Sequence, residues 1–307
     1  MDSKKIEIVI PTYRPGEELR HIIKRLNKQS YPIEQIHIID TVAEDTGIAF
    51  DSLGDNIKLT RIMKAEFDHG GTRARGMEES KAEIVVFMTQ DALPADTHLI
   101  EKLVHCFEDE KVGVAYARQL PKDDCRIIEK YTRSFNYSSC GAVKTAADLD
   151  AMGVKTYFCS DVCAAYRKDI YNAVGGFEKK VIFNEDMILA AKLIQSGYKV
   201  AYAAEAKVIH SHNYSWRQQF RRNFDLAVSQ ACHPEIFRNV SSESEGIRLI
   251  KKTVSYLLKI RKPWLIFSLI FSSGFKYSGY WLGKHYRKLP MGIIQRCTMN
   301  PAYWGFS

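Results

Sequence analysis

The 307-residue sequence lacks the glycine-rich motifs that mark two large classes of nucleotide-binding protein. It contains no Gly-x-x-x-x-Gly-Lys-[Ser/Thr] motif, and no Gly-x-Gly-x-x-Gly follows its first apolar segment. Both motifs allow the backbone to approach phosphate groups closely. Their absence argues against an ATPase and against a typical dinucleotide-binding enzyme.

Cysteine is sparse and forms no recognisable pattern. The seven cysteines include no Cys-x-x-Cys pair, so we expect reduced thiols in a cytosolic protein rather than disulfides or a zinc site. No signal peptide is expected, because Met1-Asp2-Ser3-Lys4-Lys5 leads directly into an apolar segment. The very apolar run 264–271 has eight residues, whereas a membrane-spanning helix needs roughly 20.

Acidic residues are absent after Glu245, and this gives the chain an uneven charge. The tail carries eleven lysines and arginines, more than the net charge of +8, so the first 245 residues are slightly acidic. Aromatic residues such as Trp264, Phe267 and Trp281 lie among these basic residues. A basic, aromatic, amphipathic helical segment is typical of an anionic membrane surface. The alternative is a helical cap packed on the rest of the protein.

The first half of the chain alternates strand-like and helix-like segments. Apolar strands are expected at 6–10, 36–39 and 84–88, with amphipathic helices at 17–29, 72–80 and 99–107. This order predicts an α/β fold with a mostly parallel sheet flanked by helices. Strands are also expected at 157–166, 198–203 and 206–209, a helix at 186–196, and helices from 216 onward. The polar stretch 122–153 is expected to be a long excursion with a short helix near 127–135.

Three polar clusters at the ends of these segments carry candidate chemistry. Asp91 follows the strand at 84–88 and could bind Mg²⁺ or Mn²⁺ on a diphosphate, or instead cap a helix. Glu185 and Asp186 could supply a general base, or simply favour the first turn of a helix. His210 and His212 alternate after a strand and therefore face the same way, as expected of metal or phosphate ligands.

Two basic groups are candidates for phosphate binding. Arg73 follows His69-Gly70-Gly71 at an expected helix start, where anions bind well. Arg221 and Arg222 lie in a second cation-rich patch. Charged helix faces are usually only solvated, so each group is weak evidence alone.

Taken together, these motifs resemble the inverting family-2 glycosyltransferases of the GT-A fold, and specifically the bacterial rhamnosyltransferase branch. The similarity covers roughly residues 5–230. It is carried by Ile10-Pro11-Thr12-Tyr13, by Asp40, by 67–73, by Thr89-Gln90-Asp91-Ala92, by Gly175-Gly176-Phe177 with Asn184-Glu185-Asp186, and by 210–215.

The resemblance implies a GT-A (Rossmann-like) catalytic domain over 1–215 and a basic amphipathic helical region over 216–307. It implies a catalytic base at Asp186, with Glu185 as the alternative, and an Mg²⁺ or Mn²⁺ site at Asp91, His210 and His212. It also implies acceptor binding at Gly175, Gly176 and Phe177. Donor binding is implied at Pro11, Thr12, Tyr13, Asp40, His69, Gly70, Arg73, Gln90, Arg221 and Arg222.

The implied reaction is a single-displacement transfer with inversion. The expected donor is dTDP-L-rhamnose and the expected acceptor a lipid-linked cell-surface glycan, reached from the cytoplasmic face of the membrane. Alternatives are a UDP-hexose donor, a nucleotidylyltransferase, a catalytically dead sugar-binding scaffold, or a nucleic-acid-binding protein that uses the basic tail. The acidic first part of the chain argues against nucleic acid, and the sequence leaves the oligomeric state open.

Overall fold

The computed structural model describes residues 4–43, 48–238 and 243–305. The chain divides into two compact units. Unit 1 comprises residues 1–122, 137–179 and 185–210, and unit 2 comprises 123–136, 180–184 and 211–307. Unit 2 therefore includes the segment 123–136 as well as the C-terminal tail, whereas the sequence suggested a single boundary at residue 215.

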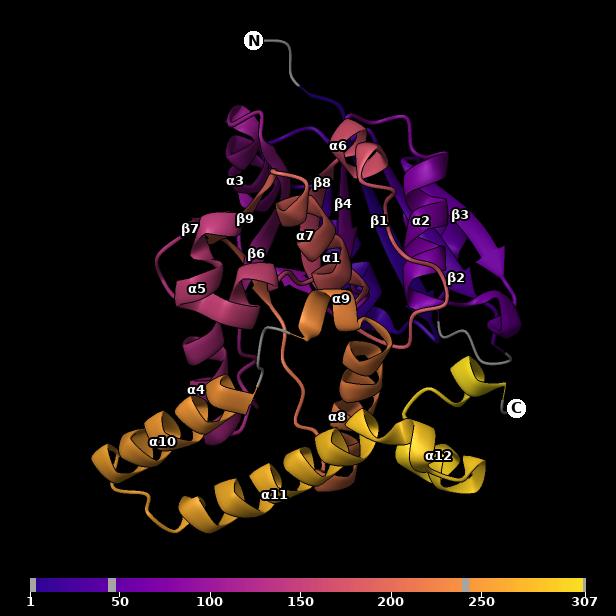
Figure 1. Ribbon diagram of the computed structural model, residues 1–307. Helices are drawn as coiled ribbons and strands as arrows, with labels where there is room; N and C mark the ends of the chain where they lie inside the picture. Colours follow the sequence, from indigo (N-terminus) through magenta and orange to yellow (C-terminus); the bar gives the residue numbers. More distant parts are fainter. Residues whose placement is uncertain (1–3, 44–47, 239–242, 306–307) are drawn as a thin grey trace. The chain divides into compact units, whose positions relative to one another are not determined.

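Unit 1 is an α/β unit built on one nine-stranded sheet (Figure 1). Its strands are β1 (Ile6–Tyr13), β2 (Gln35–Thr41), β3 (Ile57–Ile62), β4 (Ile84–Met88), β5 (Leu93–Pro94), β6 (Val112–Leu120), β7 (Ala142–Lys144), β8 (Cys163–Arg167) and β9 (Lys199–Ile209). Its helices are α1 (Glu17–Leu26), α2 (His69–Glu79), α3 (Leu99–His105), α5 (Leu149–Met152), α6 (Lys168–Ala173) and α7 (Glu185–Gln195).

The strand order is β3-β2-β1-β4-β8-β6-β9-β5, and β7 pairs with β9. The half formed by β3, β2, β1 and β4 is parallel, as predicted. The other half is mixed, because β8 runs antiparallel to both β4 and β6 while β6 and β9 are parallel. The carboxyl ends of β1, β2, β4 and β9 therefore meet at one edge of the sheet, together with the amino end of β8. Ligands of open α/β sheets bind at such an edge.

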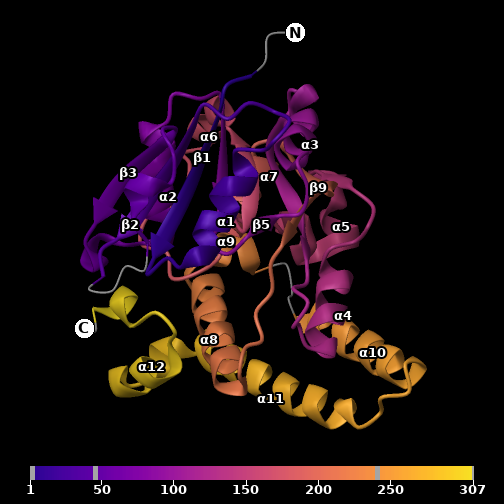
Figure 2. The same cartoon turned by 180° about the vertical axis from the view of Figure 1, so that it is seen from behind.

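Helices cover both faces of this sheet (Figures 1 and 2). On one face, α1 and α3 bury Leu19, Ile22 and Leu103 in the main apolar core, against strand residues such as Ile8 and Ile38. On the other face, α2 approaches the sheet closely at Gly76, where a side chain would overlap Val9. Burial on both faces explains why these strands read as continuous apolar runs.

The structure corrects several sequence-based boundaries. Residues 157–166 were expected to be one strand, but β8 begins only at Cys163, because a 3₁₀ turn, η5 (Gly153–Tyr157), and an irregular segment precede it. The two strands expected at 198–203 and 206–209 are the single strand β9. Strands β3, β5, β6 and β7 were not foreseen.

Unit 2 is helical in its described residues. Its helices are α4 (Ile127–Asn136), α8 (Trp216–Cys232), α9 (Pro234–Phe237), α10 (Glu243–Lys259), α11 (Leu265–Lys284) and α12 (Met291–Cys297). Gly279 and Gly283 of α11 lie directly on the α8 backbone, where any side chain would overlap the carbonyls of Phe220 and Phe224. Among the described helices, none is both long and apolar enough to cross a membrane.

Candidate active site

Thr12 and Asp40 lie side by side at the carboxyl ends of β1 and β2. They are register partners, and the Thr12 hydroxyl donates a 2.7 Å hydrogen bond to Asp40 Oδ1. Both side chains are buried. Burial raises the pKa of Asp40, and the hydrogen bond from Thr12 partly opposes this rise. The pair offers a preorganised polar group at the ligand-binding edge of the sheet.

Tyr13 and Gln90 join the ends of β1 and β4 at this edge. The Tyr13 backbone N–H donates to Gln90 Oε1 at 2.9 Å, and Gln90 Nε2 donates to the Tyr13 carbonyl at 3.0 Å. Gln90 therefore pairs with the Tyr13 backbone as another strand would. Pro11 lies within β1 just before this point. The structure thus brings Pro11, Thr12, Tyr13, Asp40 and Gln90 together, and their role in donor binding stays a prediction.

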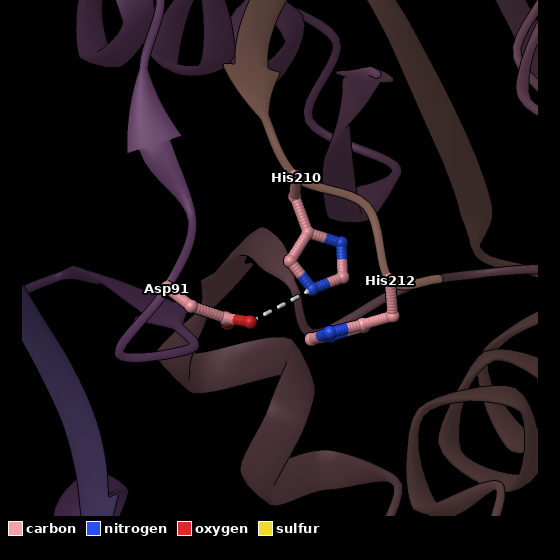
Figure 3. Close-up of side chains that lie close together, drawn as sticks. All are labelled: Asp91, His210 and His212. Atoms are coloured by element: carbon pink, nitrogen blue, oxygen red, sulfur yellow. Dashed lines mark ion pairs between the residues drawn. The ribbon is translucent and has the colours of Figure 1, made fainter. Parts of the chain in front are cut away.

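Asp91, His210 and His212 form a group with the composition of a metal site (Figure 3). His210 Nε2 lies 3.4 Å from Asp91 Oδ2. One ligand atom from each of the three residues lies within 4.8 Å of the other two. Asp91 follows β4 and His210 follows β9, so the fold brings together residues that are more than a hundred positions apart. A carboxylate and two imidazoles fit a divalent cation.

A buried charge cluster surrounds the start of α7. Glu185 Oε1 lies 3.0 Å from Arg73 Nη1, and Asp161 Oδ2 lies 3.2 Å from Arg73 Nε. Asp186 Oδ2 accepts the Asp161 backbone N–H at 3.2 Å, and its Oδ1 accepts the Met187 N–H at 2.7 Å. Two carboxylates, those of Glu185 and Asp161, thus share one guanidinium, and Asp186 adjoins them through the Asp161 backbone.

Burial, together with the neighbouring carboxylates, raises the pKa values of the acids in this cluster. Burial raises the pKa of Asp161 to about 7, against the opposing effect of Arg73. Burial, together with the carboxylates of Glu185 and Asp161, raises the pKa of Asp186 well above its ordinary value. The same carboxylates raise the pKa of Arg73 despite its burial. Such a cluster binds protons more readily than ordinary carboxylates do.

Arg73 is buried, unlike an arginine that binds a phosphate group at the protein surface. It is 6% exposed, and besides its two carboxylates it donates to the His69 carbonyl at 3.0 Å. His69 itself is more exposed, with Nδ1 4.0 Å from Glu185 Oε1. Gly70 has no room for a side chain, because a Cβ would overlap the Glu178 carbonyl. This geometry indicates that Arg73 organises the carboxylates, and donor binding by His69, Gly70 and Arg73 stays a prediction.

The Gly175-Gly176-Phe177 turn depends on its glycines. Gly175 and Gly176 have φ angles of 82° and 63°, which favour glycine. A Cβ on Gly176 would also lie 2.6 Å from the Tyr171 ring. Phe177 is buried between the rings of Phe87, Tyr166 and Tyr171. Its side chain belongs to the core and Gly176 is buried, so any acceptor contact at this turn falls to the backbone of the exposed Gly175.

Arg221 and Arg222 lie on α8 of unit 2. Arg221 Nε donates to the Arg296 carbonyl at 3.0 Å, and the Arg222 guanidinium lies over the Phe183 ring at 4.5 Å. Both side chains therefore have partners within unit 2. Their predicted role in donor binding stays a prediction.

Three residues around the site were not predicted from the sequence to have a role there. Asp161 and Ser160 fall inside the stretch that was taken as one strand, and Gln119 lies in the unforeseen strand β6. The polar pair Ser160-Asp161 before the apolar run 162–166 was the available signal for a segment boundary. Nothing in the sequence distinguished Gln119 from an ordinary surface glutamine.

Known proteins are similar to this chain in sequence and in fold. Residues 7–175 match the model of "Glycosyl transferase family 2". The chain is 38% identical over 302 residues to the O-antigen chain rhamnosyltransferase RfbN of Salmonella typhimurium, covering 98% of this chain and 96% of that protein. It is 37% identical over 301 residues to the O-antigen chain rhamnosyltransferase WbaN of Salmonella anatum, covering 97% and 95%.

Solved structures show the same architecture at low sequence identity. A mannosyltransferase from Pyrobaculum calidifontis, in complex with GDP-Man and Mn²⁺, superimposes with a TM-score of 0.58 at 15% identity, over 95% of this chain and 78% of that one. S. aureus TarS 1–349 in complex with UDP-GlcNAc gives 0.53 at 12% identity, over 92% of each chain. The predicted α/β GT-A-like class is thereby confirmed. The chain belongs to glycosyl transferase family 2, and it is a glycosyltransferase similar to the rhamnosyltransferases of that family.

Proposed function

We propose that the protein transfers L-rhamnose from dTDP-L-rhamnose to a hydroxyl group of a lipid-linked cell-surface glycan, with inversion at the anomeric carbon. Two relatives named as O-antigen chain rhamnosyltransferases, similar over nearly their whole length, support this choice. The observation that carries the mechanism is the buried carboxylate cluster at the start of α7. It lies in the same unit as the Asp91–His210 pair.

Asp186 is the better candidate for the base within the acidic pair. Glu185 Oε1 is held at 3.0 Å by the Arg73 guanidinium, which makes it a poor proton acceptor. Asp186 has no ion pair of this kind among the described contacts. Its two oxygens accept backbone N–H groups, and its raised pKa favours proton uptake. Asp186 would take the proton of the acceptor hydroxyl as that oxygen attacks the sugar.

Asp91, His210 and His212 would hold the divalent cation, Mg²⁺ or Mn²⁺. When bound, such a cation neutralises charge that develops on the departing nucleoside diphosphate. The donor set of the three residues fits this role. The Thr12–Asp40 pair would receive the nucleobase, since it presents polar groups at the carboxyl edge of the sheet.

Competition between donors tests the sugar assignment. We expect dTDP-L-rhamnose to be used with higher catalytic efficiency than UDP-glucose or UDP-galactose, and the product to have the inverted anomeric configuration by NMR. A UDP-hexose used more efficiently would contradict the donor. Loss of turnover in Glu185→Gln, with normal turnover in Asp186→Asn, would contradict the choice of base.

The proposal includes peripheral attachment to the cytoplasmic face of the membrane. Helix α11 packs Leu269, Gly279 and Gly283 inward, while Phe267 is 79% exposed and Phe271 56% exposed. The helix thus has one face packed on α8 within unit 2 and one exposed aromatic face. Its neighbours in sequence are basic and include no acidic residue after Glu245. Aromatic side chains flanked by cations suit the interface of an anionic bilayer.

Vesicle binding tests this attachment. We expect the double variant Phe267→Ser/Phe271→Ser to bind phosphatidylglycerol-containing vesicles more weakly than wild type, and high salt to weaken both. Met63→Ser is the matched control, because Met63 is 61% exposed but lies in unit 1. Equal binding by the double variant and the control would rule out α11 as the anchor.

A further inference from the structure

Ser160 and Asp161 are adjacent residues that connect two parts of the site. The metal half is the group Asp91, His210 and His212, and the base half is the acidic pair Glu185–Asp186. They lie between η5 and β8, at the edge of the sheet where β4 and β9 end. The Val162 carbonyl, one residue further on, accepts the Thr89 N–H and joins this segment to the end of β4. Neither residue belongs to the metal group or to the Glu185–Asp186 pair.

Ser160 supports the metal half through Gln119. Gln119 is 3% exposed, and its Nε2 donates to Ser160 Oγ at 2.9 Å. This orients the amide so that Oε1 faces His210 Nδ1 at 3.0 Å. His210 Nδ1 must then carry a proton, which leaves Nε2 as the ligand atom, facing Asp91. Outer partners of this kind fix the tautomer and the ring orientation of metal-binding histidines.

Asp161 supports the base half. Its backbone N–H donates to Asp186 Oδ2 at 3.2 Å. Its side chain is fixed from two sides, because Oδ1 accepts the Tyr166 hydroxyl at 2.7 Å and Oδ2 lies 3.2 Å from Arg73 Nε. The backbone donor that meets Asp186 is therefore held by the side chain of the same residue.

A buried lysine fixes the segment just upstream. Lys144 is 2% exposed, and its ammonium donates to the carbonyls of Lys155, at 3.3 Å, and Phe158. Phe158 is two residues before Ser160. The segment thus has an anchor on each side of the dipeptide, namely Lys144 upstream and the Thr89–Val162 hydrogen bond downstream.

We propose that Ser160 and Asp161 form a positioning dipeptide, which holds the metal ligand His210, through Gln119, and the base Asp186 in fixed relation to each other. The proposal rests on the proposed function, because it takes Asp186 as the base and His210 as a ligand. Movement of one chain segment would disturb both halves, whereas a change to one side chain should disturb only its own half.

Mn²⁺ binding to the full-length protein without nucleotide, measured by electron paramagnetic resonance, tests the metal half. We expect Gln119→Leu to weaken Mn²⁺ affinity by about 10–100-fold, as is typical for such outer partners, and Ser160→Ala to weaken it less. Gln119→Glu should retain binding, because a carboxylate also accepts the His210 Nδ1 proton. Wild-type affinity in both Gln119→Leu and Ser160→Ala would overturn the metal half of the proposal. Ser160→Ala removes only one oxygen and keeps the test valid should Gln119→Leu fail to fold.

Steady-state kinetics at saturating Mn²⁺ tests the base half. At pH 8, where the wild-type carboxylate pairs with Arg73, we expect Asp161→Asn to lower kcat at least tenfold while its Mn²⁺ affinity stays within about twofold of wild type. Ser160→Ala should show the reverse, with kcat recovered at saturating metal. An Asp161→Asn enzyme with wild-type kcat, or with Mn²⁺ affinity lost to the same extent as kcat, would overturn the separate roles. A wild-type protein that binds no Mn²⁺ but transfers sugar would instead refute the metal part of the proposed function.

Discussion

Asp161→Asn should make the protein more stable at alkaline pH relative to wild type, and the effect can be worked out from the structure. The folded state raises the pKa of this carboxyl from 3.8 to about 7, because the group is buried beside other carboxylates. Below pH 4 the carboxyl is protonated in both the folded and the unfolded chain. As pH rises from about 4 to 7, the unfolded chain releases the proton and the folded chain retains it. Folding stability of the wild type therefore falls through this window.

The size of the effect follows from the same two values. Between pH 5 and pH 8, an acid with these pKa values loses roughly 2–3 kcal/mol of folding free energy. Asparagine resembles the protonated acid in shape and does not titrate. The Asp161→Asn variant should therefore match wild type most closely below about pH 4 and gain roughly a further 2–3 kcal/mol relative to it between pH 5 and pH 8.

Urea unfolding of both proteins at pH 5 and pH 8, followed by tryptophan fluorescence, measures this difference. Comparing the two pH values cancels any pH-independent cost of the substitution. Arg73 is the opposing influence, because its guanidinium favours the ionised form of Asp161 at 3.2 Å. If the variant instead loses stability relative to wild type as pH rises, the ion pair with Arg73 outweighs burial, and the reasoning is refuted.

Three further predictions concern the base, the metal and helix packing. Asp186→Asn should nearly abolish transfer and leave donor binding intact in calorimetry, because the base is lost while the metal group is kept; normal turnover would contradict this. Asp91→Ala should weaken donor binding only when Mg²⁺ or Mn²⁺ is present, and an equal loss in EDTA would mean a structural role. Gly283→Ala should destabilise the protein by about 1–3 kcal/mol in thermal unfolding, because its Cβ would overlap the Phe224 carbonyl. Gly274→Ala in the same helix, where a Cβ meets nothing within 4 Å, should instead stabilise by up to about 1 kcal/mol.

Local patterns were sufficient to predict the first half of the sheet. Strands β1, β2 and β4 are short apolar runs that end at polar residues, and α1 buries one face in the expected 3.6-residue rhythm. Such periodicity follows directly from backbone geometry, so it survives folding. Strand β3 was harder to detect because it lies at the end of the sheet order and its residues are mostly half-buried.

The direction of β8 could not be derived from its own residues. Cys163 to Arg167 suits a buried strand in either direction, and only the pairing with β4 and β6 makes it antiparallel to both. This reversal brings the amino end of β8, and with it Ser160 and Asp161, to the edge where the parallel strands end. Strand direction depends on the path of the whole chain, which a local pattern does not contain.

By itself, the sequence determined the family, the alternation of strands and helices, the Asp91, Asp186 and His210 candidates, and the basic tail. These features depend on residue identity and short-range spacing, which the chain carries before it folds. Only the tertiary structure decided that Arg73 is shared by Glu185 and Asp161, and that Gln119 orients His210. Such contacts join residues dozens of positions apart. Their energies depend on burial, which exists only in the folded protein.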